Sequence, residues 1–442
     1  RRRVGKTTLL SEFCKEKPSL YYLATEESIQ ANRNAFRLMA ADFLQNDLLK
    51  SATDASWEMI FSVLLSAQEN KKMVIVLDEF QYLGKADKAF PSVFQKIWDT
   101  ILKNKNVEVI LCGSLVHMMM EQTLSYSSPL YGRRTGQIRL KQIPYAYYDR
   151  FFPDLDEQTR MMPRSSRSQA IGSHWSDVPK YIELFHPCAD IDTAILQNVM
   201  TPQSFLYEEP EFLLRQEVQD VGSYFSIIRA IASGNTRISD IASALSLPAT
   251  SLSKPLKTLC GLDILEREVP PTEKNIETSK KGQYRIKDNF LAFWFRFVYP
   301  MRSFIESDHP EIAMTKLKTG FIPNHVGYVY EDICRQKMWE LNAQGKLPFL
   351  FDRVGRWWGG KDTEIDIVAI DTTDRSKIIL GECKFHQNVP MQLSELHQLK
   401  EKAAVVPWGN ANRDEYFALF CISGYSEDLQ QLAQEDSHLL LM

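Results

Sequence analysis

Two short motifs near the C-terminus contain the residue types of a metal-dependent phosphate site. One reads E-I-D-I-V at 364–368 and the other reads G-E-C-K at 381–384, and each lies in an apolar run. A polar segment, D-T-T-D-R-S at 371–376, separates the two runs. Apolar, β-branched runs on either side of a short polar turn predict a β-hairpin.

The register of this hairpin determines which side chains meet. If the turn is centred on Asp374, residue 366 lies opposite residue 382. Because side chains alternate between the faces of a strand, Asp366, Glu382 and Lys384 then share one face. Carboxylates bind divalent metals, and a nearby lysine can stabilise charge on a phosphate. The motifs therefore predict a metal site with Asp366 and Glu382 as ligands. The alternative is an E-x-K pair whose charges are simply solvated.

A helix-like segment upstream supplies a further carboxylate. Glu331 lies in Y-E-D-I-C at 330–334, ahead of the hairpin. Gln398, on the segment after the lysine strand, is another residue that could point at the site. The predicted catalytic residues of the hairpin are Asp366, Glu382 and Lys384.

The chain begins with a second motif for phosphate chemistry. Residues 1–8 read R-R-R-V-G-K-T-T, the last part of the pattern G-x-x-x-x-G-K-[ST]. The leading glycine would precede Arg1, so we expect a further segment upstream. Lys6 would reach the β- and γ-phosphates, and the Thr7 hydroxyl would bind Mg²⁺. A helix from Thr8 to Cys14 would present free N–H groups to the anion. The predicted nucleotide-binding residues here are Gly5, Lys6, Thr7 and Thr8, and the alternative is an incidental G-K-T-T tetrapeptide.

An apolar run that ends in two carboxylates follows in the order expected of a P-loop ATPase. It reads M-V-I-V-L-D-E at 73–79. Asp78 would hold the metal through water, and Glu79 would polarise the attacking water. The alternative is a buried strand with solvated carboxylates at its end. The next apolar run ends at Ser114, which suits a residue that senses the γ-phosphate beside Asp78. Arg133 is a candidate arginine finger, with a solvated basic loop as the alternative.

The elements that would position these residues alternate along the first 150 positions. Strand-like runs occur at 19–24, 73–77 and 107–113, and amphipathic stretches occur at 29–43 and 57–68. Strands that alternate with helices predict a parallel sheet covered by helices. The expected fold class is therefore α/β, with a P-loop NTPase sheet.

The expected domains follow shifts in composition along the chain. They are an ATPase core at 1–150, a helical lid at 151–215, a winged helix at 216–300, a helical linker at 301–325 and a small α/β domain at 326–442. The lid is proline-rich, with a polar and mobile stretch expected at 160–172. The last domain is expected to run helix, strand hairpin, helix and strand, with W-W-G at 357–359 just before the first strand.

The winged-helix prediction depends on the order of five segments. They are helices at 223–232, 237–245 and 250–259, followed by strands at 264–268 and 283–287. The third helix would be the recognition helix, which enters the major groove in DNA-binding proteins of this kind. Its polar residues are Ser251, Ser253, Lys254 and Lys257. Because the two strands carry mixed charges, DNA binding and docking to a partner both stay open.

Several of these segments resemble a known ATPase family. R-R-R-V-G-K-T, L-D-E-F-Q-Y-L, L-x-G-S and L-Y-G-R at 130–133 resemble the archaeal-type AAA-family ATPases of the STAND group, over residues 1–300. V-P-K-Y at 178–181 resembles the lid motif of that family, in which Pro179 would contact adenine. Ser176-Asp177 stands here in place of the usual glycine pair. The resemblance implies ATP and Mg²⁺ as cofactors.

The C-terminal residues resemble a nuclease superfamily. Glu331, Asp366 and E-x-K at 382–384 resemble the PD-(D/E)xK nucleases, which hold Mg²⁺ with an Asp and a Glu. Residues 326–425 also resemble a domain of unknown function found at the C-terminus of these ATPases. The resemblance implies a restriction-endonuclease-like fold acting on DNA or RNA. It also implies Glu331 as a further catalytic residue beside Asp366, Glu382 and Lys384.

Length and composition fit this organisation. A chain of 442 residues suggests two to four domains at ~100–200 residues each. The net charge of −4 gives no global basic field. The seven cysteines are scattered without a C-x-x-C pair, which favours reduced thiols and a cytoplasmic location. Apolar runs stay shorter than the ~18 residues that span a bilayer, so we expect no membrane partner.

Together these patterns predict an ATPase joined to a nuclease-like domain. ATP with Mg²⁺ is the expected ligand, DNA or RNA is the expected substrate, and a homo-oligomer stays open. ATP binding would control access of nucleic acid to the C-terminal carboxylates. Two alternatives stay open. One is an ATP-dependent regulatory switch whose C-terminal domain only binds DNA or a partner. The other is a transcription regulator that acts through the winged helix.

Overall fold

The computed structural model describes residues 3–67, 72–151, 178–185, 190–360, 363–385, 389–410 and 412–442. Within it the chain divides into two compact units, Arg1–Gln142 and Ile143–Met442. Two expectations for the lid lie outside the described residues: the polar stretch at 160–172 and the Ser176-Asp177 pair.

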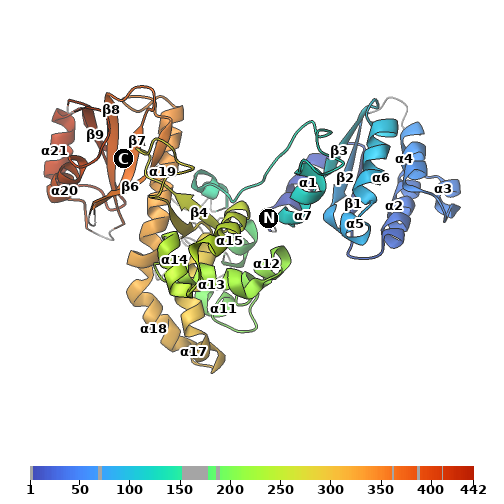
Figure 1. The fold of residues 1–442 in the computed structure, drawn as a ribbon, viewed down its shortest axis with the longest axis horizontal. Coiled ribbons are helices and arrows are strands. Elements are labelled where there is room, and N and C mark those ends of the chain that lie inside the picture. Colours follow the sequence, from blue (N-terminus) through green and yellow to red (C-terminus); the bar gives the residue numbers. More distant parts are fainter. Residues whose placement is uncertain are drawn as a thin grey trace. The chain divides into compact units, whose positions relative to one another are not determined.

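A three-stranded parallel sheet forms the centre of the first unit (Figure 1). Its strands, in spatial order, are β1 (Ser19–Leu23), β2 (Met73–Asp78) and β3 (Val107–Leu111). All six residues of β2 are buried, as expected for a central parallel strand covered on both faces. The predicted parallel sheet is therefore confirmed. Asp78 is the last residue of β2 and lies at the carboxyl end of this strand.

Helices enclose this sheet. They are α1 (Lys6–Cys14), α2 (Ile29–Leu44), α3 (Asp47–Ser51), α4 (Trp57–Ser66), α5 (Gln81–Ala86), α6 (Phe90–Ile97) and α7 (Val116–Met119), with the π-helical turns η1 (Trp98–Leu102) and η2 (Met120–Leu124). Ser28 and Ser56 cap α2 and α4 by accepting hydrogen bonds from backbone N–H groups in the first turn. Both helices therefore begin where the sequence pattern places them.

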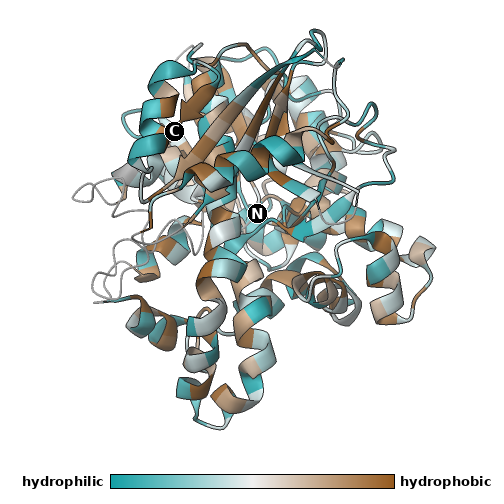
Figure 2. Ribbon diagram, turned by 90° about the vertical axis from the view of Figure 1, so that its left-hand side faces the viewer, coloured by the Kyte–Doolittle hydropathy of each residue, from teal (hydrophilic) through white to brown (hydrophobic). Residues whose placement is uncertain are grey.

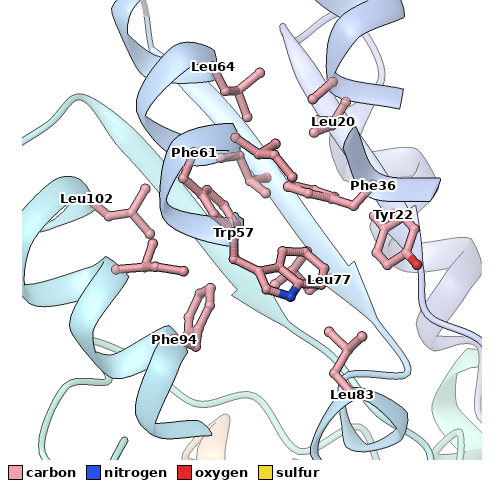
Figure 3. Close-up of a cluster of buried hydrophobic side chains, with 14 of the residues drawn as sticks. Leu20, Tyr22, Phe36, Trp57, Phe61, Leu64, Leu77, Leu83, Phe94 and Leu102 are labelled. Atoms are coloured by element: carbon pink, nitrogen blue, oxygen red, sulfur yellow. The ribbon is translucent and has the colours of Figure 1, made fainter. Parts of the chain in front are cut away.

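An aromatic cluster packs the helices onto the sheet (Figure 3). The ring centroid of Phe36, on α2, lies 5.1 Å from that of Phe61 and 5.4 Å from that of Trp57, both on α4. Leu77, the residue before Asp78, belongs to the same cluster. Burial of such side chains contributes ~1.5–3 kcal/mol each, so the cluster fixes β2 and the carboxylates at its end.

The second unit begins with helices. They are η3 (Tyr145–Arg150), α10 (Pro179–Phe185), α11 (Ile191–Asn198), α12 (Glu209–Glu217), α13 (Val221–Ala232), α14 (Ile238–Leu245) and α15 (Ala249–Gly261). An antiparallel hairpin of β4 (Leu265–Glu268) and β5 (Gln283–Ile286) follows directly. Ser246, at φ 53°, ends α14 in the left-handed region, and α15 starts three residues later. Three helices and a hairpin therefore occur in the expected order.

Further helices lead to the C-terminal sheet. They are α16 (Asn289–Phe293), η5 (Trp294–Val298), η6 (Tyr299–Met301), α17 (Arg302–Glu306), α18 (Pro310–Phe321), η7 (Ile322–Val326) and α19 (Gly327–Ala343). The aromatic run at 290–299 lies largely in the core, with Phe293 and Trp294 fully buried.

The C-terminal sheet is mixed and has five strands in the order β10–β9–β8–β7–β6. They are β6 (Arg353–Gly359), β7 (Thr363–Ile370), β8 (Lys377–Lys384), β9 (Asp414–Cys421) and β10 (Leu439–Leu441). The two helices of this part are α20 (Leu393–Ala403) and α21 (Glu427–Glu435). Strands β6, β7 and β8 pair antiparallel, whereas β9 joins β8 in parallel. The strands near the C-terminus are coloured mainly hydrophobic, as expected for a sheet that forms a core (Figure 2).

The hairpin register matches the prediction. Ile367 lies opposite Gly381 and Ile370 lies opposite Ile378, which centres the turn on Asp374. One expectation was wrong. Residues 357–359 do not precede the first strand but form the end of β6, where a bulge between Gly355 and Trp357 breaks the alternation that marks a strand.

The six cysteines in the described part of the chain are free thiols. Over the same residues, none of the helices is both long and apolar enough to cross a membrane.

Candidate functional site

Gly5 shapes the backbone of the N-terminal phosphate motif. It adopts φ 84°, in the left-handed region that favours glycine, and its carbonyl oxygen accepts a 2.9 Å hydrogen bond from the N–H of Leu9. Helix α1 begins at Lys6, two residues earlier than expected, because Gly5 already supplies the turn. Lys6 and Thr7 therefore lie in the first turn, where free N–H groups attract an anion, and Thr8 follows them.

The phosphate motif and the carboxylate strand meet at Thr7 and Asp78. Thr7 Oγ1 donates to Asp78 Oδ2 at 3.3 Å. Asp78 is 1% exposed, and its Oδ1 accepts the N–H of Glu79 at 2.9 Å. A threonine hydroxyl and an aspartate carboxylate are the oxygen ligands that Mg²⁺ prefers. The residues present therefore fit a magnesium ion at this point.

Two neighbours of Asp78 were not anticipated from the sequence. The hydroxyl of Tyr21, on β1, donates to Asp78 Oδ2 at 2.5 Å, and its pKa is raised by burial and by this carboxylate. Cys112 lies on the other side of β2, and burial together with Asp78 raises the pKa of its thiol to about 12. Parallel pairing of β1 and β3 with β2 brings both residues to Asp78, which could be inferred only once the strand order was known.

Glu79 is held by its own set of donors. Ser114 donates to Glu79 Oε2 twice, through Oγ at 2.6 Å and through its N–H at 3.3 Å. Gln81 Nε2 also donates to Oε2. Glu79 has φ 54°, an uncommon backbone conformation for a residue with a side chain. Ser114 was expected beside Asp78, but the structure places its hydroxyl on the neighbouring carboxylate.

Arg133 is engaged elsewhere in the first unit. Its Nε and Nη2 bind the carboxylate of Asp99 at 3.0 and 2.9 Å, and its Nη1 donates to the carbonyl of Pro129 at 2.9 Å. This two-point pair restrains the guanidinium. These contacts hold Arg133 at Asp99, and its role as an arginine finger stays a prediction.

Pro179 is the first residue of α10, in the second unit. Proline suits the first turn of a helix because its missing N–H would have no helical partner there. The contact of Pro179 with adenine stays a prediction.

The C-terminal motifs assemble a carboxylate cluster, made of Glu331, Asp366 and Glu382 with the basic residues Arg335, Lys384 and Lys402. Asp366 Oδ2 accepts the N–H of Cys383 at 2.8 Å, which ties β7 to β8 beyond their last ladder pair. Burial, and then the charge of Glu382, raises the pKa of Asp366 to about 6. The two predicted metal ligands therefore lie close enough to repel each other.

Glu382 is bound by two lysines. Lys384 Nζ lies 2.7 Å from its Oε1, as E-x-K spacing on one strand face predicts. Lys402 Nζ, from α20, lies 3.0 Å from its Oε2. Lys402 was missed, whereas Gln398, which was considered, is exposed. The lysines of α20 were the only signal in the sequence for a second partner of Glu382. Which lysine reaches Glu382 depends on how the helix docks on the sheet.

Glu331 reaches the cluster from α19. Burial, and then the charge of Asp366, raises its pKa to about 8. Arg335 lies one turn further along α19, with Nη1 3.6 Å from Glu331 Oε2 and 3.2 Å from the carbonyl oxygen of Asp366. Arg335 was also missed, although its i+4 spacing from Glu331 was visible in the sequence.

Within the described residues, no group of three or more His, Cys, Asp or Glu side chains has the arrangement of a preformed metal site. Asp366 and Glu382 still offer two adjacent carboxylates whose mutual repulsion a cation would relieve. The donor set therefore fits an ion that also binds water or a phosphate oxygen.

Two protein families match the chain. One, described as an ATPase domain predominantly from Archaea, matches residues 1–183 and so includes Lys6, Asp78 and Glu79. The other, described as archaeal and bacterial proteins of unknown function, matches residues 294–402 and so includes the carboxylate cluster.

Individual proteins are similar as well. "Uncharacterized protein MJECL04" of Methanocaldococcus jannaschii is 32% identical over 421 residues, covering 95% of this chain and 89% of that protein. "Uncharacterized protein MJ0424" of the same organism is 35% identical over 92 residues, covering 21% of this chain and 88% of that protein. Among solved structures, the Walker-type ATPase PABY2304 of Pyrococcus abyssi has 22% identity and a TM-score of 0.49, covering 67% of this chain and 89% of that one.

Proposed function

We propose that the chain, which belongs to one family with the M. jannaschii relative matching 95% of its length and whose residues 1–183 match an ATPase domain predominantly from Archaea, binds and hydrolyses ATP at the end of β2. The observation that carries the proposal is the hydrogen bond from Thr7 to Asp78. It joins the first turn of α1 to the carboxylate at the carboxyl end of β2.

Each side chain has a defined task in this proposal. Lys6 would neutralise the β- and γ-phosphates. Thr7 and Asp78 would hold Mg²⁺, which would supply charge withdrawal from the phosphates. Glu79 orients the attacking water. Its three hydrogen bonds converge on Oε2, which leaves Oε1 for the water.

Substitution of Glu79 tests the assignment. E79Q should retain ATP binding and lose turnover by ~10²-fold or more, the range expected for a residue that positions or activates water. E121Q, at an exposed glutamate of the same unit, is the matched control. Hydrolysis by E79Q at the rate of E121Q would remove Glu79 from this role.

We also infer that the carboxylate cluster hydrolyses phosphodiester bonds of DNA or RNA, in the manner of a PD-(D/E)xK nuclease. Water attacks phosphorus and one P–O bond breaks, which leaves a phosphate monoester and an alcohol. The shared position of Asp366 and Glu382, with Lys384 on the same face, supports this assignment. Asp366 and Glu382 would hold the divalent metal, Lys384 would stabilise the charge that develops on the phosphate, and Glu331 would act from α19.

Metal binding can be measured without a nucleic-acid substrate. Titration calorimetry with Mn²⁺ should show a site that is lost in D366A and kept in D414A, a control at an exposed aspartate on the same sheet. Equal binding by both variants would exclude Asp366 as a ligand. Because both sites occur in one chain, we also propose that ATP binding controls the access of nucleic acid to the carboxylate cluster.

A second candidate function is DNA-binding regulation through a winged helix formed by α13–α15 and β4–β5. Four polar residues of α15 favour it by being exposed, so a duplex could reach them: Ser251, Ser253, Lys254 and Lys257. In this reading the chain is an ATP-dependent switch without nuclease activity. Duplex affinity that falls at least tenfold in K254E/K257E, with no cleavage by the wild type, would support it.

A further inference from the structure

The β4–β5 hairpin and its connecting loop, residues 269–282, pack against the C-terminal sheet. The side chain of Arg353, on β6, donates to the carbonyl oxygen of Glu273 at 2.8 Å and to that of Pro271 at 3.3 Å. The indole N–H of Trp357 donates to the hydroxyl of Thr272 at 3.1 Å. The hairpin that follows α13–α15, the three-helix segment, is therefore fixed to β6, the strand next to β7.

A partly buried chain of charges continues this contact toward the carboxylate cluster. Arg285, on β5, binds Asp332 of α19 through Nη2 at 2.5 Å. Arg285 also binds Glu266 and Glu268 of β4, and Glu268 in turn binds Arg356 of β6 at 3.1 Å. Asp332 is the neighbour of Glu331 in sequence. The hairpin therefore contacts α19 at the turn that carries a candidate catalytic carboxylate.

Asp332 links Arg285 to Arg335. One oxygen of Asp332, Oδ1, binds both Arg285 and Arg335. The other nitrogen of the Arg335 fork, Nη1, donates to the carbonyl of Asp366 and faces Glu331. A guanidinium presents its donors in a rigid plane, so the position of one nitrogen determines the position of the other.

Arg285 also affects Arg335 through its charge. The two guanidinium groups repel each other, whereas both are attracted to Asp332. If the charge of Arg285 is removed, Asp332 is left to Arg335 alone. The Arg335 fork would then be held more tightly by Asp332, and its contacts with the carbonyl of Asp366 and the carboxylate of Glu331 would weaken.

We propose that Arg285 is a positioning residue for the carboxylate cluster, and that the β4–β5 hairpin acts as an internal clamp on α19 and β7. The cluster function on which this inference rests is the proposed nuclease site. The inference adds a regulatory consequence: a movement of the three-helix segment that withdraws Arg285 would loosen Glu331 and Asp366 together.

Hydrogen–deuterium exchange of the whole chain tests the clamp without requiring activity. In R285M, we expect exchange of the N–H of Cys383, which binds Asp366, and of the β7 amides to rise at least about tenfold, or ~1.4 kcal/mol in local opening free energy. R285K keeps the charge and should restore most of the protection. The matched control is K287M, because Lys287, just after β5, forms an ion pair at 2.9 Å with Asp263, just before β4.

The outcomes separate this inference from the nuclease proposal. Equal protection of β7 in R285M and K287M would overturn the clamp, whether or not the wild type cleaves nucleic acid. A specific loss of protection in R285M, in a protein that neither binds Mn²⁺ nor cleaves, would support the clamp and reject the nuclease. If R285M does not fold, D332N replaces it. Unchanged protection of β7 in D332N would then count against the clamp.

Discussion

Ser114 donates a 2.6 Å hydrogen bond from its hydroxyl to Glu79, and its backbone N–H points to the same carboxylate oxygen. The two residues follow different strands, β2 and β3, so strand pairing determines how the carboxylate is oriented. Ser114, three residues beyond the end of β3, is thereby tied to the proposed water-positioning glutamate.

Removal of the Ser114 hydroxyl should impair catalysis more than binding. With the hydroxyl bond to Oε2 lost, the Glu79 carboxylate samples more orientations, and we expect S114A to lower kcat for ATP by about tenfold with KM nearly unchanged. Steady-state kinetics of S114A would be compared with S62A, at an exposed serine of α4. A kcat equal to that of S62A would show that Ser114 does not orient Glu79.

The Thr7 hydroxyl should matter only when Mg²⁺ is present. T7A loses one oxygen ligand, so we expect ATP affinity measured with Mg²⁺ to fall about tenfold, or ~1.4 kcal/mol. Affinity measured in the presence of EDTA should change little. T7S keeps the hydroxyl and serves as the control. An equal loss in both variants would point to packing of α1 as the cause.

Lys402 should stabilise the C-terminal sheet as well as its site. The Glu382 side chain is 8% exposed and depends on two ammonium groups. K402M should therefore lower the free energy of unfolding by about 1.5–3 kcal/mol, the range for a hydrogen bond to a charged group. Urea denaturation of K402M would be compared with K400M, an exposed lysine on the same helix. Equal midpoints would contradict the assignment.

Asp332 should make the second unit sensitive to acid. Arg285 and Arg335 hold the pKa of this carboxyl well below its usual value, despite burial. A lowered pKa stabilises the folded state above the unfolded value of ~3.9, and this stabilisation is lost as the pH falls below it. D332N, which cannot ionise, should be less stable than the wild type at pH 7, and the difference should shrink below about pH 4. A difference that is constant from pH 7 to pH 3 would contradict the lowered pKa.

Much of the site could be predicted because local patterns determine it. The apolar runs and the polar turn set the register that brings Asp366 opposite Glu382. The G-K-T motif marks the start of α1, and the D-E motif marks the end of β2. What was missed depends on tertiary packing. Tyr21 contacts Asp78 because β1 pairs with β2, and Lys402 contacts Glu382 because α20 docks on the sheet. The bulge in β6 interrupts the alternation by which a strand is recognised in a sequence.

The contacts of Arg133 could not be predicted from motifs. Its role as an arginine finger stays a prediction, and its guanidinium is bound at two points by Asp99, in the π-helical turn η1. A pairing between residues 34 positions apart in an irregular segment leaves no periodic signal in the sequence.

The most direct test of the account is a cleavage assay on labelled single- and double-stranded DNA and RNA with Mg²⁺ or Mn²⁺, with and without ATP. We expect the wild type to cleave, ATP to change the rate, and D366A and K384A to abolish cleavage, while D414A and K400A behave as the wild type. Absence of cleavage by the wild type under every condition, with nucleic acid still bound, would contradict the nuclease assignment and favour the regulatory switch.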